Sequence, residues 1–357
     1  MPPSRAVTPP PPRRRRAARG ATIAEVARAA GVSIATVSRV VNDIPHRVGE
    51  ATRRRVLRAV RALDFRPNVL ARSLHRLHTR TLGLILPDIS NPYYAEITRG
   101  VEAVARRHGY ALFICDTDRE PAAMAHHIRL CREHQVDGVI VAGGGTWGRA
   151  HLAGLAARGM AAVLIGRHDV RLPAVRVDNV KGAYLAAQHL VRAGHRRIAV
   201  IAGPAASTTG ADRLAGYRLA AREHGLSIPP RWVRAGDLRP ASGAEAASAL
   251  LRLRPRPTAI LAANDQMAIG AMRAARAAGL AVPDDLSVVG FDDIELASCV
   301  TPPLTTMALP LARMGAAAME IMLRCLADPH HAEEIWFTPE LAARESSGPA
   351  PEKETHR

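Results

Sequence analysis

Hydrophobic periodicity divides the chain into a short helical region and a longer region of alternating elements. Near the N-terminus, apolar residues recur with the spacing of one helix face over residues 23–30 and again over residues 34–41, with Gly31 between them. Thr22 and Glu25 have the spacing of a capping box, which predicts that the first helix begins after Thr22. Two short helices joined by a tight, glycine-containing turn form a helix-turn-helix.

A third helix is predicted over residues 50–63. Its apolar side contains Val56, Val60 and Leu63, and its opposite side is basic, with Arg53, Arg54, Arg55, Arg58 and Arg61. In a DNA-binding helix-turn-helix, the second helix lies in the major groove and its first residues contact base edges. We therefore predict a small all-α helix-turn-helix DNA-binding head over residues 21–66.

After about residue 80, apolar segments alternate with amphipathic ones. Strand-like segments lie at residues 82–86, 111–115, 138–142, 161–165, 175–177, 198–202, 259–262 and 286–289. Helix-like segments separate most of them, at residues 93–108, 122–134, 149–157, 182–193, 212–224, 241–253 and 266–278. This alternation is typical of parallel sheets covered by helices on both faces. The units are too many for one simple sheet, so we predict an α/β body of two doubly wound parallel-sheet lobes.

Polar side chains follow most of the predicted strands. They are Asp88, Asp116, Arg167, Asp178, Asn264 with Asp265, and Asp292 with Asp293. Ligands of open parallel sheets bind beyond the carboxyl ends of the strands, so the set predicts a cleft for a polar small molecule. Each residue taken alone is also explained as a helix cap or a turn residue.

Positive charge is concentrated in the first part of the chain. The net charge is +17, and residues 1–80 contain 18 arginines, no lysine and four acidic residues, which leaves only +3 for the other 277 residues. A basic segment joined to a nearly neutral body indicates a nucleic-acid-binding module on a regulatory or catalytic body. Residues 1–20 are rich in proline and arginine and are predicted to be disordered. Their arginines are either solvated or add contacts to DNA phosphates.

Composition excludes other classes of protein. A chain of 357 residues that is 48% hydrophobic suffices for two or three domains, and it has neither an apolar span for a bilayer nor a secretory signal. The four cysteines lie far apart in the sequence, at Cys115, Cys131, Cys299 and Cys325. We therefore expect a cytoplasmic protein with reduced thiols, no membrane contact, no bound metal and no cofactor.

The motifs of doubly wound enzymes are missing from the sequence. There is no GxGxxG after a strand, no GxxxxGK[ST], no GxSxG and no HExxH. Three glycines follow the strand at 138–142 without the dinucleotide-binding spacing, and we interpret them as a loop. The prediction is that the chain is not an enzyme, with a doubly wound enzyme kept as the remote alternative.

A dense set of specific residues runs through both regions. The head contains TIAEVARAAGVSIATVSRVVN at residues 22–42, then Thr52, Arg53 and residues 65–74, and the body has matching segments at 88–94, 177–179, 194–198, 213–217, 264–270 and 290–293. Over residues 21–347 the chain resembles the LacI/GalR family of bacterial transcriptional regulators. The resemblance implies a repressor that binds double-stranded DNA at an inverted-repeat operator. It also implies an effector domain similar to periplasmic sugar-binding proteins.

The resemblance implies a set of DNA contacts in the head. They are Thr22, Ser33, Ile34, Ala35, Thr36, Ser38, Arg39, Asn42 and Arg53. Arg39 can donate two hydrogen bonds to guanine, whereas Ile34 and Ala35 could read only thymine methyls or DNA shape. Ile34 is alternatively a packing residue at the start of its helix.

A hinge helix and linker are implied at residues 67–80. Asn68, Ala71 and Leu74 match DNA-contacting positions, and Leu74 matches the leucine that wedges into the minor groove. Such a wedge unstacks a base step and bends the DNA. From its own sequence context, Leu74 is an ordinary linker or helix residue.

The resemblance places an effector between the two lobes of a domain at residues 81–347, followed by a tail at 348–357. Its implied contacts are Asp88, Tyr93, Tyr94, Arg167, Arg213, Leu238, Asn264 and Asp292. Arg213 is alternatively part of a salt bridge between the lobes. The chain is expected to cross between the lobes near Arg167, Ser298 and Leu326.

Two departures from the family pattern bear on the effector. Leu238 stands where purine- and galactoside-binding members have an aromatic residue, and Ser207 replaces an arginine of the purine-responsive member. We therefore expect a sugar or a sugar derivative. No leucine heptad follows residue 348, so a homodimer is expected. The alternative within the family is a regulator that is gated by a partner protein.

Overall fold

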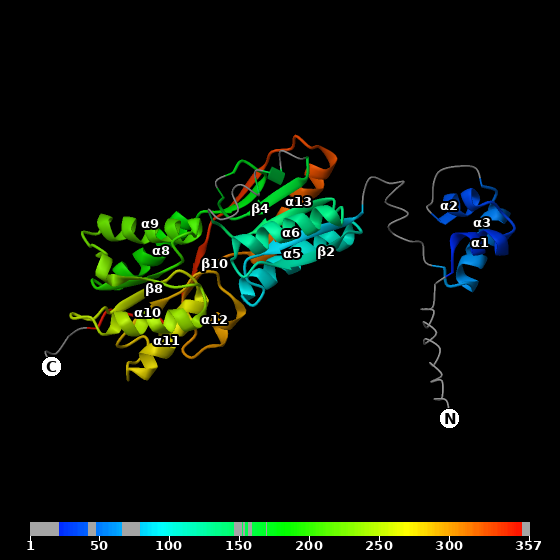
Figure 1. Cartoon of the computed structure of the whole chain (residues 1–357). Coiled ribbons are helices and arrows are strands. Elements are labelled where there is room, and N and C mark those ends of the chain that lie inside the picture. Colours follow the sequence, from blue (N-terminus) through cyan, green and yellow to red (C-terminus); the bar gives the residue numbers. More distant parts are fainter. Residues whose placement is uncertain are drawn as a thin grey trace, which may run out of the picture. The chain divides into compact units, whose positions relative to one another are not determined.

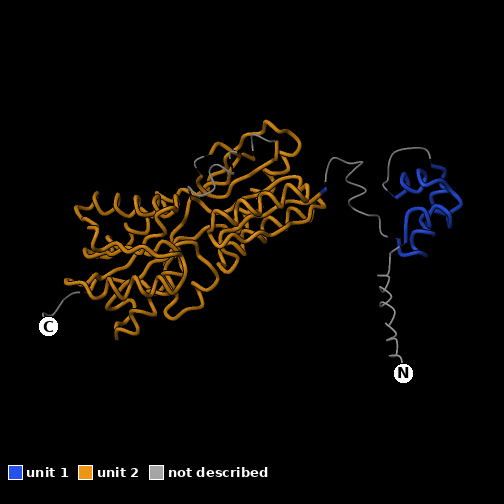
Figure 2. The backbone as a smooth tube through the Cα atoms, in the orientation of Figure 1, with its two compact units in different colours: residues 1–79 blue, residues 80–357 orange. Residues whose placement is uncertain are grey.

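The chain forms two compact units, residues 1–79 and residues 80–357 (Figure 2). The structure is a computed structural model that describes residues 21–41, 48–65, 79–145, 152, 154–155, 159–168 and 170–351. The expected N-terminal tail and most of the helix expected at 149–157 lie outside these residues.

The first unit contains three helices, α1 (Ile23–Ala30), α2 (Ile34–Val41) and α3 (Glu50–Ala62). The capping box is confirmed: the Thr22 hydroxyl accepts from the Glu25 N–H at 3.3 Å, and the Glu25 carboxylate accepts from the Thr22 N–H at 2.7 Å. Val26, Val37 and Val56, one from each helix, pack together in the core. The burial predicted for Leu63 is wrong, since α3 ends before it and it is 37% exposed.

The first lobe of the body has a six-stranded parallel sheet in the order β11-β5-β4-β3-β1-β2. Its strands are β1 (Thr81–Leu86), β2 (Ala111–Asp116), β3 (Gly138–Ala142), β4 (Ala161–Ile165), β5 (Ala174–Val177) and β11 (Glu334–Phe337). Leu82, Leu84 and Leu86 join the core that contains α5 (Pro92–Arg107) and α13 (Leu311–Ala327). Ile85 joins a second core with α6 (Pro121–Glu133), because side chains of a strand alternate between faces. The first sheet is therefore covered on both faces.

The second lobe repeats this plan with a four-stranded parallel sheet in the order β7-β6-β8-β9. Its strands are β6 (Ile198–Ala202), β7 (Val233–Ala235), β8 (Ala259–Ala262) and β9 (Ser287–Val289). In Figure 1, α8 (Asn179–Arg192) and α9 (Thr208–Glu223) lie on one side of β8, and α10 (Pro240–Leu251) and α11 (Asp265–Ala277) lie on the other. The predicted fold class, a small helical head and two doubly wound lobes, is confirmed.

The chain crosses between the lobes three times, at positions that differ from those expected. The first crossing lies near Asp178, after β5 has completed its place in the first sheet. The second joins β10 (Thr306–Ala308) to α13, and the third joins β11 to β12 (Glu340–Ala342), which pairs with β10. The crossings expected near Arg167, Ser298 and Leu326 are wrong, because each of those residues precedes an element that still belongs to its starting lobe.

The C-terminal part holds the elements that the sequence analysis omitted. They are α12 (Glu295–Cys299), β10, α13 and β11, together with β7 and the short 3-10 helix η1 (Pro230–Trp232) earlier in the chain. Helix α13 has a readable pattern, since Leu311, Met314, Ala318 and Met322 recur at helical spacing on its buried side. The short strands carry no such signal. Among the described residues, no helix is both long and apolar enough to cross a membrane.

Candidate functional site

The head exposes the residues that were expected to contact DNA. Ile34 is 52% exposed at the start of α2, so the alternative that it packs into the core is not supported. Ala35 and Arg39 are also exposed, and Thr36 and Ser38 are half-buried on the same helix. Ser33 caps α2, and its hydroxyl accepts from the Thr36 N–H at 3.2 Å. The outer side of α2 therefore presents side chains that can reach base edges.

Arg53 is exposed on α3, and Thr22 is exposed at the N-terminus of α1. Four residues expected to contact DNA lie outside the described residues: Asn42, Asn68, Ala71 and Leu74. The roles assigned to all the head and hinge residues stay predictions.

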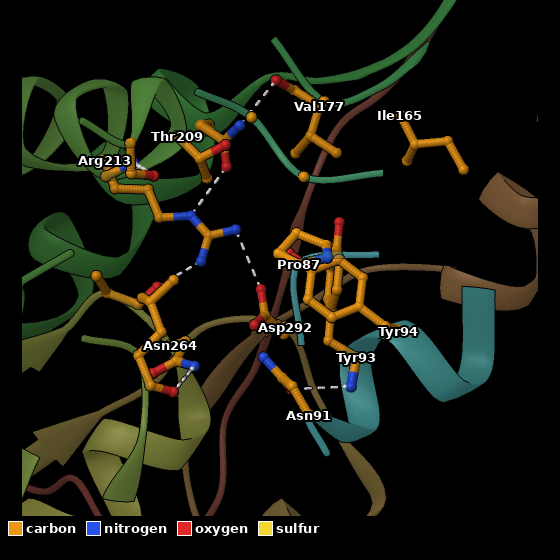
Figure 3. A pocket seen from close by; sticks show the side chains of 18 of the residues that line it. Pro87, Asn91, Tyr93, Tyr94, Ile165, Val177, Thr209, Arg213, Asn264 and Asp292 are labelled. Carbon is orange, nitrogen blue, oxygen red and sulfur yellow. Dashed lines mark hydrogen bonds and ion pairs between the residues drawn. The ribbon is translucent and has the colours of Figure 1, made fainter. Parts of the chain in front are cut away.

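A cavity of about 60 Å³ lies between the two lobes of the body (Figure 3). The first lobe contributes Pro87, Asn91, Tyr93, Tyr94, Arg119, Gly143, Gly144, Ile165 and Gly166, and the second contributes Ser207, Thr209, Gly210, Arg213, Leu238, Ala263 and Asn264. Val177 and Asn179 line it from the first crossing, and Asp292 lines it from the segment that follows β9 in the second lobe. Six of the eight expected effector contacts thus come together here.

Arg213 is the most highly connected side chain of the cavity. Its Nε donates to Asn179 at 2.9 Å, its Nη2 donates to Asp292 at 3.1 Å, and its Nη1 donates to the Ala263 carbonyl. Its guanidinium lies 3.5 Å from the centroid of the Phe291 ring. These partners belong to the second lobe and the crossing segments. The salt bridge of Arg213 therefore holds one wall of the cavity and does not join the lobes.

Asp292 is a buried carboxylate at the end of β9. Burial raises its pKa to about 6, although the charge and hydrogen bond of Arg213 oppose this rise. Burial also raises the pKa of the neighbouring Asp265 well above its usual range. The protonation of Asp292 therefore changes readily near neutral pH, and a further charge in the cavity would shift its pKa.

Two tyrosines form the opposite wall. Tyr93 and Tyr94 at the start of α5 meet edge to face with ring centroids 4.9 Å apart. Burial raises the pKa of Tyr94 to about 12, and Arg119 is the strongest of the groups that oppose this rise. Both hydroxyls therefore stay protonated as hydrogen-bond donors at neutral pH. Leu238 lies at the cavity with a φ of 74°, and its carbonyl accepts from Asn264 Nδ2 at 3.0 Å.

The other two expected effector contacts, Asp88 and Arg167, lie outside the cavity lining. Asp88 accepts from Arg239 Nε at 3.3 Å, and Arg167 Nε pairs with Asp212 at 3.1 Å. Arg239 and Asp212 belong to the second lobe, whereas Asp88 and Arg167 belong to the first. Each pair therefore joins the two lobes, and neither Asp88 nor Arg167 lines the cavity.

Several lining residues were not anticipated from the sequence. Asn91 and Ser207 are helix caps of α5 and α9; Ser207 was considered only as a departure from the family pattern, and Asn91 was not considered as a site residue. Two of the three glycines interpreted as a loop, Gly143 and Gly144, also line the cavity. A side chain at Gly144 would meet the Thr209 hydroxyl at 2.6 Å, so a glycine there permits the lobes to approach. No sequence pattern indicated that Arg119 would line the cavity, because it lies in a turn outside the regular elements.

Comparison with known proteins assigns the chain to a family. Residues 79–344 match the family described as periplasmic binding proteins and sugar binding domain of the LacI family, and residues 22–68 match the bacterial regulatory proteins of the lacI family. The chain belongs to the LacI family. It is 36% identical over 333 residues to the HTH-type transcriptional repressor PurR of Aliivibrio fischeri (strain MJ11), which covers 91% of this chain and 98% of PurR.

Solved structures of LacI-family regulators share the whole architecture. The Lac repressor dimer bound to operator and the anti-inducer ONPF is 30% identical, with a TM-score of 0.84, and covers 92% of this chain and 100% of its own. The transcriptional regulator CelR in complex with cellobiose is 31% identical, with a TM-score of 0.70 over the same shares. These relatives are DNA-binding regulators, so the prediction that the chain is a regulator and not an enzyme is confirmed.

Proposed function

We propose that the protein is a cytoplasmic, homodimeric transcriptional repressor whose operator affinity is controlled by a small molecule in the interlobe cavity. The observation that carries the proposal is a polar cavity lined from both lobes, in a chain that also holds an exposed helix-turn-helix. A ligand changes an equilibrium only through different affinities for its two states. A ligand that touches both lobes meets this condition, because lobe opening removes its contacts with one of the lobes.

The cavity favours a ligand of monosaccharide size. At ~10–15 Å³ for each water, a volume of about 60 Å³ holds about four to six waters, or roughly 120–180 Å³ of liquid. That is comparable to one sugar ring and too small for a disaccharide such as the cellobiose of CelR. Hydroxyl and amide groups on Tyr93, Asn179, Thr209 and Asn264 suit a hydroxyl-rich molecule. We therefore propose a sugar or a sugar derivative as the effector.

The proposed homodimer rests on apolar side chains exposed on the body. Phe113 and Ile114 are each 48% exposed on β2, which is an edge strand of the first sheet. Large apolar side chains gathered at a sheet edge mark an interaction surface. The Lac repressor relative is a dimer on its operator. Two-fold symmetry of such a dimer requires an inverted-repeat operator.

The proposal is tested with the full chain, an operator selected from random DNA, and a panel of monosaccharides and disaccharides. We expect one class of monosaccharide-sized compound to raise the melting temperature and to change operator affinity in the same concentration range. Thr209→Val removes a cavity hydroxyl but no helix cap, and it should weaken both effects. The matched control Thr98→Val changes a threonine of α5 that lies outside the cavity lining. If no compound acts and a co-purifying protein changes operator affinity instead, the alternative of a partner protein is correct.

A further inference from the structure

Arg119 is a cavity residue with buried donors that the described part of the chain does not satisfy. Its Nε and Nη2 atoms are buried and have no hydrogen-bond partner among the described residues. A buried guanidinium donor without a partner is costly, and such atoms in a cavity indicate a ligand that accepts from them. Arg213, the other cavity arginine, has Asp292 as its counter-charge.

The turn that carries Arg119 holds it toward the cavity. Asp118 and Arg119 both have left-handed backbones, with φ values of 44° and 63°. Residues other than glycine rarely adopt this conformation, and its cost is of the order of 1 kcal/mol for each residue. The turn is fixed by hydrogen bonds from the Arg119 N–H to the Pro87 carbonyl at 3.0 Å and from the Glu120 N–H to the Thr117 carbonyl at 2.8 Å. Within this turn, Asp118 pairs with Arg239 of the second lobe, whereas Arg119 lines the cavity.

The electrostatics of the whole cavity favour an anion. Its charged lining residues are two arginines and one aspartate. Four helices also begin at the cavity, since lining residues Asn91, Asn179, Ser207 and Asn264 cap or start α5, α8, α9 and α11. Each helix N-terminus contributes roughly half a positive charge and so favours a negatively charged group.

We infer that the effector carries an acidic group, a carboxylate or a phosphate, that binds to Arg119, with its hydroxyl groups directed to the rest of the cavity. This inference rests on the proposed function, because it names the chemical class of the same effector. A guanidinium binds either acidic group with two parallel hydrogen bonds, so the two sources share one recognition chemistry. The effector is then a sugar acid or a sugar phosphate and not a neutral sugar.

The first test uses sulfate as the probe and needs no knowledge of the effector. Sulfate should bind the wild-type chain with a Kd at least about tenfold lower than that of Arg119→Gln, the effect of losing one charged hydrogen bond. Arg107→Ala is the matched control, because Arg107 is an exposed arginine of the same lobe outside the cavity. Any sulfate bound by the basic head should be the same in all three proteins, because the head is unchanged in them. Arg119→Lys keeps the charge but not the paired donors and should fall between wild type and Arg119→Gln.

The second test compares ribose, ribonate and ribose 5-phosphate, which differ in their acidic group. Tighter binding of either anion than of ribose, lost in Arg119→Gln, supports the inference, and the order of the two anions identifies carboxylate or phosphate. Equal sulfate binding by wild type and Arg119→Gln overturns it, and so does preference for ribose. A neutral sugar that still controls operator affinity would leave the proposed function standing. An anion that binds through Arg119 without changing operator affinity would instead refute the proposed control of operator affinity by the cavity ligand.

Discussion

Arg239 is the residue through which lobe closure can be perturbed most directly. It lies at the start of α10 in the second lobe and forms ion pairs with Asp88 and Asp118 of the first lobe. The Arg239 side chain is 45% exposed, and those of Asp88 and Asp118 are 5% and 65% exposed. Asp88 is buried, but Arg239 is open to solvent in both pairs, so we take about 0.2–1 kcal/mol for each pair, and the two together favour the closed lobes by about 0.4–2 kcal/mol. Arg239→Ala should therefore lower the ratio of closed to open lobes by roughly 2- to 30-fold.

This change is measured as a distribution of distances between spin labels placed on exposed positions of α5 and α9, one label in each lobe. We expect the variant to shift toward longer distances and its apparent Kd for a cavity ligand to rise by up to the same factor, since only the closed state binds fully. Arg324→Ala is the matched control. It breaks an ion pair of 2.9 Å with Glu333 that has similar exposure but lies within the first lobe. Distances that are unchanged in Arg239→Ala, or equally changed in Arg324→Ala, would refute the reasoning.

Three further predictions concern the head, the cavity and the core. Arg39→Ala should cost ~1–3 kcal/mol of discrimination between operator and random DNA. Arg53→Ala should instead weaken binding to operator and random DNA alike, and titrations at several salt concentrations should show that the slope of log binding constant against log salt concentration falls by about one. Sulfate affinity should increase as the pH falls through about 6, because an anion bound to Arg119 in the same cavity favours protonated Asp292; in Asp292→Asn this pH dependence should disappear in calorimetric titrations. Burial lowers the pKa of His195 below its usual 6.5, where it bonds Thr258, Ser287 and Gly348 at 3.0–3.1 Å. The unfolded state then binds one more proton than the folded state, so the free energy of unfolding measured in urea should decrease as the pH falls below about 6.5. His195→Gln should reduce this dependence on pH, whereas the same change at the exposed His126 should not.

Periodicity predicted most of the regular elements of this protein, and it would also have found α13, whose buried side has helical spacing. The strands of both sheets that are buried on two faces were predicted because they are continuous apolar runs, as at β3 and β8. Edge elements carry a weaker pattern, and β11, with alternate exposure and Trp336 60% exposed, was not predicted. The crossings were misplaced because a crossing depends on which sheet accepts the next strand. No local pattern reports that choice.

The cavity was predictable where its residues end strands or match the family pattern, as for Asn264 and Asp292. Arg119 was not, because its direction depends on two left-handed residues and on a hydrogen bond to Pro87 of a neighbouring strand end. Asp88 follows β1 as expected, yet its partner Arg239 lies 151 positions away and draws it to the edge of the cavity. Cys115 and Cys131 lie 16 positions apart in the sequence, yet a hydrogen bond with the Cys131 thiol lowers the pKa of Cys115 to about 7. Such pairings arise only from tertiary structure.

Asp292→Ala is an unsuitable probe of the effector site, because Asp292 is the counter-charge of buried Arg213. Breaking a buried ion pair by removing one partner costs about 3–5 kcal/mol, so alanine would destabilise the body itself. Asp292→Asn keeps the shape and a hydrogen-bond acceptor and is the better probe of the cavity.

The most direct test of ligand-gated DNA binding is one titration of the full chain on its selected operator, with and without a saturating cavity ligand. In the wild type we expect the ligand to change operator affinity at least about tenfold, within the range of 1–3 kcal/mol that is typical of allosteric coupling. Thr209→Val should keep the operator affinity of the free protein and, at the same ligand concentration, show a weaker response to the ligand. An operator affinity that is the same with and without bound ligand would contradict the account.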